Sequence, residues 1–421
     1  MKKLIALYAS SRYWNNETEL KAAYGALAAQ MKDIVSESIL ITTMEDVAQM
    51  PEADCLVIVP MSGGVQPLIL ESVTKYNSTV IYAMYIIGNT TEEFSDKMIM
   101  KNAAPTVMDT WAVIRREHAH GSIAISEEKL KRRLKVYEAY HSLKGATILL
   151  IGNTEPWVVS NSKNRESYEK LGVTVKQIEQ EEVARLYREM TDEDARVYYD
   201  YFKGNEKKIV EPTEEDINAS AKMTAALVKT VDKYKPAGIA LACFNLLAEG
   251  TNMCLGVSYI NDRLPQVAAC EGDVDSAVTM LLMKRLTSSK LWMANPNLHP
   301  DGTVNFSHCT APLDLFNNGF CPYILRNHHE SGIGTSLQVE YPIGQRVTAC
   351  RLSDEAGKIT IHQGTTVQGK YESGCRTQVY VKFDDFDHYL DTALGCHQVF
   401  AFEDIEEELK MLAQELKLVI L

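Results

Sequence analysis

Residues 268–312 read AACEGDVDSAVTMLLMKRLTSSKLWMANPNLHPDGTVNFSHCTAP and contain the pattern on which the predicted fold depends. The segment 266–270 is short and apolar, which predicts a buried strand. Three acidic residues follow, Glu271, Asp273 and Asp275, and then apolar residues at helical spacing predict a helix that buries one face. Carboxylates between a strand and a helix lie where α/β folds place their chemistry, although such acids can also simply cap the helix.

Length and composition indicate an ordinary soluble protein of two or three domains. The chain has 421 residues, of which 46% are hydrophobic and 24% are charged, as in globular proteins. No apolar run reaches the ~20 residues of a membrane helix. The apolar stretch near the N-terminus is shorter than the core of a secretion signal and is better explained as a first strand. We therefore expect a cytoplasmic protein that does not bind membranes.

Charge and cysteine usage argue against two further classes. The formal net charge is −13 and no basic stripe is present, so we expect no nucleic-acid partner. The nine cysteines are scattered without CxxC pairs. This predicts reduced thiols rather than disulfides or a zinc finger.

Residues 1–144 alternate strand and helix patterns, which predicts a Rossmann-like α/β domain with a parallel, doubly wound sheet. The expected strands are 3–9, 38–41, 54–60 and 79–85, and the expected helices include 17–31 and 65–73. Arg12 and Trp14 follow the first strand, where Trp14 could stack on a sugar ring or simply pack. Met61-Ser62-Gly63-Gly64 follows the third strand, where an ordinary tight turn is the main alternative to an oxyanion-binding loop.

The alternation resumes after a charged helix over 126–142 and a capping Gly145, which mark a domain boundary. The second α/β domain is expected over 145–305, with strands 146–152 and 238–244 and helices around 163–171, 181–190 and 213–234. Glu249 lies in a polar cluster after the second of these strands. It is a candidate to bind the hydroxyl groups of a ligand, and a surface glutamate is the alternative.

From about residue 304, the strand patterns become short and are separated by Gly or Asp turns. The segments are 336–341, 346–352, 358–362, 365–369 and 377–383. They predict an antiparallel barrel or sandwich over 306–421. A final strand, helix and strand are expected over 397–402, 403–416 and 417–421.

Three short motifs after residue 240 occur in a definite order. They are Glu271-Gly272-Asp273, then Phe306-Ser307-His308-Cys309 followed by Ala311-Pro312, and Gly395-Cys396-His397-Gln398-Val399-Phe400. Together with the domain order along the whole chain, they resemble the L-fucose/L-arabinose isomerase superfamily. The resemblance implies two Rossmann-like domains, a C-terminal antiparallel β-barrel, and a metal-dependent sugar isomerase.

The same resemblance implies a metal site. The ligands would be Glu271, Asn295 and His397, with His308 as a candidate fourth, and catalysis would rest on Glu271 and Asn295. Asn295 stands where the family has a second carboxylate. It can ligate through its carbonyl oxygen, but it adds no charge and cannot accept a proton, so we expect weaker metal binding and a proton route through Glu271 or a water. Oxygen and imidazole ligands suit Mn²⁺, with Mg²⁺, Fe²⁺ or Co²⁺ as alternatives.

Two further groups of polar residues could contribute to the predicted site. Arg326 and His329 belong to a dense polar stretch that could contact substrate hydroxyls or an anionic substituent, although a polar loop is an equal alternative. Adjacent histidines on an extended segment point to opposite sides, so at most one of the pair at 328–329 should face the site. Asp273 and Asp275 are expected to cap the helix or to support the ligands.

The predicted activity is aldose–ketose isomerisation of a pentose, a deoxyhexose or a substituted hexose through an enediol. Asn295 leaves two alternatives open: a non-catalytic sugar-binding or regulatory protein on the same scaffold, and a single-metal epimerase or lyase. The resemblance also implies a homo-oligomer, a trimer or hexamer, in which Arg12 and Trp14 complete the site of a neighbouring subunit.

Overall fold

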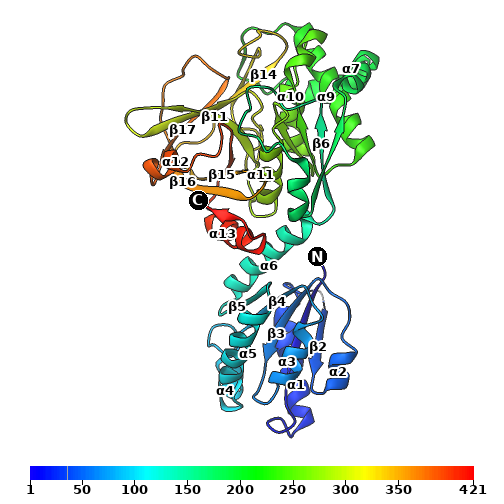
Figure 1. Cartoon of the computed structure of the whole chain (residues 1–421), viewed down its shortest axis with the longest axis vertical. Coiled ribbons are helices and arrows are strands. Elements are labelled where there is room, and N and C mark those ends of the chain that lie inside the picture. Colours follow the sequence, from blue (N-terminus) through cyan, green and yellow to red (C-terminus); the bar gives the residue numbers. More distant parts are fainter. Residues whose placement is uncertain (36) are drawn as a thin grey trace. The chain divides into compact units, whose positions relative to one another are not determined.

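The computed structural model of the chain describes residues 1–35 and 37–421 and divides into two compact units, Met1–Ser142 and Leu143–Leu421 (Figure 1). It contains two α/β regions built on parallel sheets and one large mixed sheet. The predicted mixed α/β class with parallel sheets is therefore confirmed. No described helix combines the length and the apolar character needed to cross a bilayer.

The first unit is built on a five-stranded parallel sheet. Its order is β2-β1-β3-β4-β5, with the strands β1 (Lys3–Tyr8), β2 (Glu37–Ile41), β3 (Cys55–Pro60), β4 (Ser78–Tyr82) and β5 (Gly121–Ala124). Every residue of β3 and β4 is buried, because helices cover both faces of the sheet.

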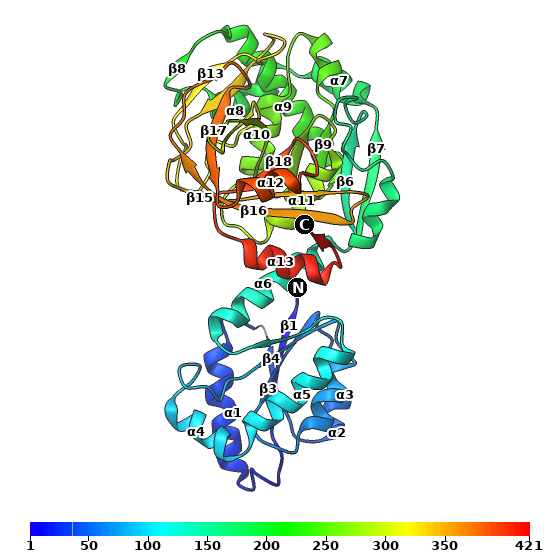
Figure 2. The same ribbon diagram turned by 60° about the vertical axis from the view of Figure 1, so that its left-hand side comes forward.

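Two hydrophobic clusters hold these helices. Side chains of α1 (Glu17–Met31), α4 (Glu92–Met100) and α6 (Glu127–Leu143) pack on one face of the sheet. Side chains of α2 (Met44–Ala48), α3 (Gln66–Val73) and α5 (Ala103–Glu117) pack on the other. Figure 2 shows α1 on one side of the strands and α2, α3 and α5 on the other. The predicted doubly wound arrangement follows from these two layers.

The second unit begins with a four-stranded parallel sheet of order β10-β9-β6-β7. Its strands are β6 (Ala146–Ile151), β7 (Val173–Ile178), β9 (Gly238–Leu241) and β10 (Val267–Cys270). One face packs against α7 (Gln180–Glu189), α9 (Glu214–Tyr234) and α10 (Cys254–Arg263). The chain goes from β6 to β7 on one side and later to β9 on the other, so the strand order reverses between β6 and β9, where open α/β sheets bind ligands.

The helix that follows the acidic residues, α11 (Val274–Lys284), is buried more completely than the sequence predicts. It contacts β6, β9 and β10 and also β15 (Arg346–Ser353) and β18 (Gln398–Ala401) of the large sheet, and it lies between β6 and β15 in Figure 1. Residues 274–283 are all buried. The prediction of one buried face is wrong because the large sheet covers the second face.

The large mixed sheet has the order β15-β18-β11-β12-β17-β16-β19, and β15 also pairs with β16. Its other strands are β11 (Trp292–Leu298), β12 (Thr303–His308), β16 (Lys358–Val367), β17 (Thr377–Phe383) and β19 (Val419–Ile420). All neighbours are antiparallel except β16 and β19. Two predicted strands, 358–362 and 365–369, form the single strand β16. The predicted closed barrel stays a prediction.

The remaining elements surround these sheets. A small sheet has the order β14-β13-β8, with β14 (Ser336–Val339), β13 (Tyr323–Arg326) and β8 (Lys208–Ile209), and the further helices are α8 (Asp192–Phe202), α12 (Phe386–Asp391) and α13 (Glu406–Glu415). Two predictions are corrected here. The predicted helix 163–171 is a short 3₁₀ helix over Arg165–Leu171, and the predicted strand 238–244 ends at Leu241, before a 3₁₀ helix over Phe244–Glu249.

His362 in β16 couples folding to pH. Its ring is buried and packs against Phe383 and Tyr389, at centroid distances of 6.0 and 5.3 Å. Burial, assisted by the neighbouring His388, lowers the pKa of His362 from 6.5 to about 4. Because the folded state keeps this ring neutral, its contribution to stability is complete above pH 6.5 and is lost as the pH falls toward 4.

We predict that His362→Phe makes the free energy of unfolding less dependent on pH at acid pH. Between pH 7 and pH 4.5, the free energy of unfolding of the wild type should fall by roughly 1–3 kcal/mol more than that of the variant. The reason is that only the wild type exposes, on unfolding, a histidine ring that takes up a proton in this pH range. Urea unfolding at a series of pH values measures this difference. Parallel profiles for the two proteins would contradict the prediction.

Candidate metal centre

The side chains of Glu271, His308 and His397 converge in the second unit. Nε2 of His397 lies 3.4 Å and Nε2 of His308 lies 3.7 Å from Oε1 of Glu271. Within residues 1–35 and 37–421, this is the one group of three or more His, Cys, Asp or Glu side chains spaced to hold a metal ion, with all three ligand atoms within 4.8 Å of one another. Ligands about 2.1 Å from a tetrahedral metal are separated by about 3.4 Å, so the spacing fits a bound ion.

The three side chains come from different parts of the second unit. Glu271 follows β10 of the parallel sheet, whereas His308 ends β12 and His397 directly precedes β18. Strands β12 and β18 flank β11, which carries Asn295. The centre therefore forms where the carboxyl end of the parallel sheet meets three neighbouring strands of the large sheet.

The backbone at Glu271 takes an uncommon conformation. Glu271 and Gly272 both lie in the left-handed region, with φ of 58° and 62°, which costs a non-glycine residue roughly 1–2 kcal/mol. A Cβ on Gly272 would lie 2.7 Å from the backbone oxygen of Asn153, so only glycine fits there. The loop after β6 holds the turn, because the Glu155 N–H donates to the Glu271 carbonyl (3.0 Å) and Thr154 Oγ1 donates to the Gly272 carbonyl (2.9 Å).

Trp157 from the same loop orients the Glu271 carboxylate. Its indole Nε1–H donates to Oε2 of Glu271 at 2.7 Å, which leaves Oε1 facing the two histidines. The Trp157 ring is 50% exposed and meets Phe244 edge to face, with centroids 4.7 Å apart. This side chain therefore fixes a ligand and also presents an aromatic surface beside the centre.

Hydrogen bonds to Nδ1 orient both histidines. Nδ1 of His397 donates to Oδ2 of Asp273 (2.8 Å), and Nδ1 of His308 bonds to Oγ1 of Thr310 (2.8 Å). In each ring Nε2 remains for a metal, as in metal-binding histidines whose second nitrogen is held by a polar partner. Nε2 of His397 is buried without a hydrogen-bond partner. An orphaned imidazole nitrogen facing a carboxylate oxygen is what a metal ion would satisfy.

Opposite charges dominate the electrostatics of the centre. Burial alone would raise the pKa of Glu271, but His308 and His397 outweigh it and hold that pKa below its ordinary value. Burial likewise opposes ionisation of Asp273, and Arg351 and His397 reverse the effect, so its pKa is also lowered. Burial lowers the pKa of His397, but its interactions with Asp273, Cys396 and Glu271 outweigh burial and raise that pKa above its ordinary value. A divalent cation would take the place of the His397 proton.

Asp273 connects the centre to the core. It is the N-cap of α11, accepting from the Ser276 N–H at 2.9 Å, which confirms the predicted capping role. Its Oδ2 also accepts from Nη1 of Arg351 at 2.6 Å, and both side chains are fully buried. Asp275 accepts from Tyr168 Oη at 2.7 Å. Both predicted supporting acids therefore hold elements that position Glu271 and His397.

Glu271 and His308 open into one cavity, which we call the metal cavity. It is lined by Cys243, Phe244, Leu247, Asn252, Met253, Cys254, Cys270, Glu271, Asn295, His308, Cys309, His328, Glu330 and Cys375. About 40 Å³ of the cavity is accessible to the centre of a water molecule. The total empty volume is about 480 Å³, which includes the open mouth. That room suits an ion with roughly two or three waters, or one end of a small polar ligand.

The structure brings only some of the predicted site residues together. Asn295 lines the metal cavity together with Glu271 and His308, whereas the buried His397 is not part of the lining. Arg326 lies elsewhere and forms a two-pronged ion pair with Glu211. Glu249 pairs with Arg188.

The remaining predicted residues also lie away from the cavity lining. Of the adjacent histidines, His328 lines the cavity and His329 does not. Arg12 and Trp14 belong to the first unit. Arg12 is exposed. Trp14 is buried, donates from Nε1 to the Met61 carbonyl, and has the Lys101 ammonium over its ring at 4.2 Å.

Trp157 and Glu330 line or border the centre but are missed by the sequence reasoning. Trp157 follows the strand β6 in a polar segment, the same signal that draws attention to Glu249 after β9. Glu330 lies in the polar stretch from which Arg326 and His329 are chosen. The five cysteines in the cavity lining could not be found from the sequence, because they come from five separate segments and form no motif.

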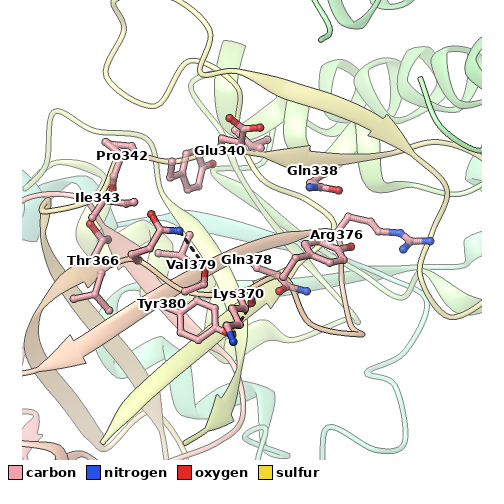
Figure 3. A pocket seen from close by; sticks show the side chains of 16 residues that line it. Gln338, Glu340, Pro342, Ile343, Thr366, Lys370, Arg376, Gln378, Val379 and Tyr380 are labelled. Atoms are coloured by element: carbon pink, nitrogen blue, oxygen red, sulfur yellow. Dashed lines mark hydrogen bonds between the residues drawn. The ribbon is translucent and has the colours of Figure 1, made fainter. Parts of the chain in front are cut away.

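A larger cavity of the second unit contains none of these ligands. This outer groove, about 510 Å³, is lined by residues 338–343, 366–371, 376 and 378–380 (Figure 3). Its lining holds one carboxylate, Glu340, and no histidine or cysteine. Volume alone would favour this groove as the site of chemistry. The donor atoms favour the smaller metal cavity, because a metal ion needs several carboxylate or imidazole ligands and the groove offers only Glu340.

Comparison with known proteins finds no family model and no curated protein that matches the chain. The assignment of function therefore depends on the geometry of the site and on the motifs in the sequence.

We predict that Trp157→Phe weakens metal binding by about tenfold or more, the usual effect of removing a hydrogen bond that orients a ligand. Phenylalanine keeps an aromatic ring but leaves Oε2 of Glu271 without its donor. Isothermal titration of the metal-free protein with Mn²⁺ measures the change, and Trp111→Phe in the first unit is the control. Equal affinities for the wild type and Trp157→Phe would contradict the orienting role.

Proposed function

We propose that the protein is a metal-dependent aldose–ketose isomerase that acts on a pentose, a deoxyhexose or a substituted hexose through an enediol. One observation carries the proposal: Nε2 of His308, Nε2 of His397 and Oε1 of Glu271 converge beside a cavity that Glu271, His308 and Asn295 line. Glu271, His308 and His397 belong to the motifs that resemble the metal site of the L-fucose/L-arabinose isomerase superfamily, and Asn295 stands where that family has a second carboxylate.

Glu271, His308 and His397 would hold the ion, with the carbonyl oxygen of Asn295 as the fourth ligand. Mn²⁺ suits this mixture of oxygen and imidazole, with Mg²⁺, Fe²⁺ or Co²⁺ as alternatives. When bound, the metal supplies stabilisation of the negative charge that develops on the sugar oxygens at C1 and C2. A neutral amide in place of a carboxylate leaves one negative ligand, Glu271, so the affinity for the ion is lower than at a site with two.

The proton that moves between C1 and C2 needs a carrier other than Glu271. Oε2 of Glu271 accepts from Trp157 and its Oε1 faces the two histidines, so both carboxylate oxygens are engaged. Glu330 is the other carboxylate in the lining of the metal cavity as the described residues define it. We therefore assign the proton transfer to Glu330.

His328 suits hydrogen bonding to the substrate. Burial lowers its pKa, so the ring is neutral near pH 7. Its Nδ1 accepts from the Ser331 N–H at 3.4 Å, which places the ring proton on Nε2. A neutral ring with a proton on Nε2 donates to a sugar oxygen and does not act as the base.

The size of the cavity indicates which part of a sugar enters it. Space for an ion and a few waters admits the C1–C2 end of an open-chain aldose, while the remaining carbons stay at the mouth. The half-exposed Trp157 ring lies beside Glu271 and offers an apolar surface to those carbons.

The activity is tested by incubating the Mn²⁺-loaded protein with aldopentoses and deoxyhexoses in D₂O and following the products by NMR. The proposal predicts a ketose that carries deuterium from solvent at C1. A C2 epimer would instead identify the single-metal epimerase. Sugar binding with no exchange of carbon-bound hydrogen, for any sugar bound, would identify the binding protein.

For the assigned proton carrier, we predict that Glu330→Gln lowers kcat by about 100-fold or more, within the usual range for a general acid–base group. Mn²⁺ affinity should stay unchanged, because Glu330 is not a ligand. Glu193→Gln, an exposed position on α8, is the matched control and should keep wild-type kcat. Full turnover by Glu330→Gln would contradict the assignment.

The same resemblance leads us to propose a cytoplasmic homo-oligomer, a trimer or hexamer, with the exposed Arg12 contributing to a neighbouring subunit's site. Sedimentation equilibrium measures the assembly. A fully active monomer would contradict this part of the proposal.

A further inference from the structure

Thiols gather around the metal cavity. The chain has nine cysteines, and five of them line this cavity: Cys243, Cys254, Cys270, Cys309 and Cys375. The proposed isomerisation uses none of these side chains. Their concentration at one small site therefore calls for a separate explanation.

Cys243 and Cys270 form the pair with the most defined geometry. Their Sγ atoms are 3.3 Å apart. Strands β9 and β10 are parallel neighbours in which Leu241 is opposite Cys270, so Cys243 begins the loop just past the same edge of the sheet. A disulfide has an S–S length of about 2.05 Å. The two sulfurs would need to approach by little more than about 1 Å, which rotation of the side chains and a small shift of the adjoining backbone supply together.

Access differs between the two thiols. Cys243 is partly exposed and lies in the cavity lining, whereas Cys270 is 4% exposed. A small oxidant that enters the cavity therefore meets Cys243 first. The buried Cys270 is held in place by its backbone N–H, which donates to Sδ of Met293 at 3.1 Å.

We propose that Cys243 and Cys270 are a site of reversible oxidation, at which a peroxide produces a disulfide that releases the metal ion from Glu271. The first part, the disulfide, stands on the thiol geometry alone. The second part rests on the proposed metal centre.

The chemistry balances in two steps. The Cys243 sulfur attacks one oxygen of hydrogen peroxide, the O–O bond breaks, and the products are a sulfenic acid on Cys243 and one water. The Cys270 sulfur then attacks the Cys243 sulfur, the S–O bond breaks, and a second water leaves as the S–S bond forms. The two thiols lose two electrons and the peroxide gains them. A dithiol such as dithiothreitol reverses the change.

The effect on the metal follows from the covalent connection between Cys270 and Glu271. Moving Cys270 toward Cys243 shifts the peptide that sets the left-handed backbone of Glu271, and the Trp157 hydrogen bond to its carboxylate moves with it. Metal sites tolerate ligand displacements of only about 0.2 Å. Loss of about tenfold or more in metal affinity is therefore expected, as when a ligand loses its orienting partner.

The test uses the full chain loaded with Mn²⁺ and treated with hydrogen peroxide, with a reduced sample alongside. Free thiols are alkylated, the protein is digested, and disulfide-linked peptides are identified by mass spectrometry while retained Mn²⁺ is measured by elemental analysis. The oxidised protein should contain a Cys243–Cys270 link and retain about tenfold less Mn²⁺. Dithiothreitol followed by fresh Mn²⁺ should restore the metal content.

Cys243→Ser removes the attacking thiol while leaving Glu271 and its neighbours in place. This variant should retain Mn²⁺ after peroxide treatment. Cys321→Ser, at a partly exposed cysteine outside the cavity lining, should behave as the wild type. A serine at either position keeps nearly the same volume, and circular dichroism verifies that each variant folds.

Three outcomes would overturn the proposal in distinguishable ways. Absence of the Cys243–Cys270 link, or a link among Cys254, Cys309 and Cys375 in its place, would contradict the assigned site. Formation of the link with full Mn²⁺ retention would contradict the release. A reduced protein that never binds Mn²⁺ would contradict the metal centre itself, while the peptide masses would still decide whether the disulfide forms.

Discussion

The hydrogen bond from Nδ1 of His397 to Oδ2 of Asp273 joins the large sheet to α11 at the metal centre. Both side chains are fully buried, and Arg351 from β15 donates to the same carboxylate oxygen. Removing one member of such a buried charged group leaves an uncompensated charge and costs about 3–5 kcal/mol. The group therefore stabilises the interface between the two sheets, and this interface sets the distance between Nε2 of His397 and Glu271.

This arrangement also bears on the proposed metal site with an amide at 295. The charge needed to attract a cation comes from Glu271, and Asp273 contributes through His397 rather than by direct contact. Asp273 is balanced by Arg351, so the ligands themselves carry one net negative charge. An ion held there is bound less tightly than at a site with two carboxylates, and small displacements of Glu271 matter more. The thiols next to Glu271 are well placed to cause such displacements.

Much of the fold is predictable from the sequence because periodicity reports burial. The helix α1 matches its predicted bounds, and the predicted strands of both parallel sheets lie within a few residues of the observed ones, whereas the strands β5 and β7 are not predicted. The depth of α11 is not predictable, because its second buried face depends on a sheet formed from residues far along the chain. The prediction divides β16 at Gly364, but the strand runs through this glycine. Its continuity likewise depends on neighbouring strands that are distant in the sequence.

The candidate site shows the same limit. Glu271, Asn295, His308 and His397 are found from local motifs and their order. The structure brings Glu271, His308 and His397 together, and Asn295 lines the same cavity as Glu271 and His308. Arg326 and Glu249 have equally polar surroundings in the sequence, but each is matched to an opposite charge that only the fold brings near, Glu211 and Arg188. The two members of each ion pair are separated by more than 60 residues of chain. Tertiary packing brings them together, and a local sequence pattern does not encode that packing.

The most direct test of the metal centre is anomalous diffraction from crystals soaked in Mn²⁺. The account predicts one strong anomalous peak about 2.1 Å from Oε1 of Glu271 and from Nε2 of both His308 and His397. It also predicts loss of that peak in crystals of Glu271→Ala. No peak at these three side chains in well-diffracting wild-type crystals, or a peak that persists in the variant, would contradict the account.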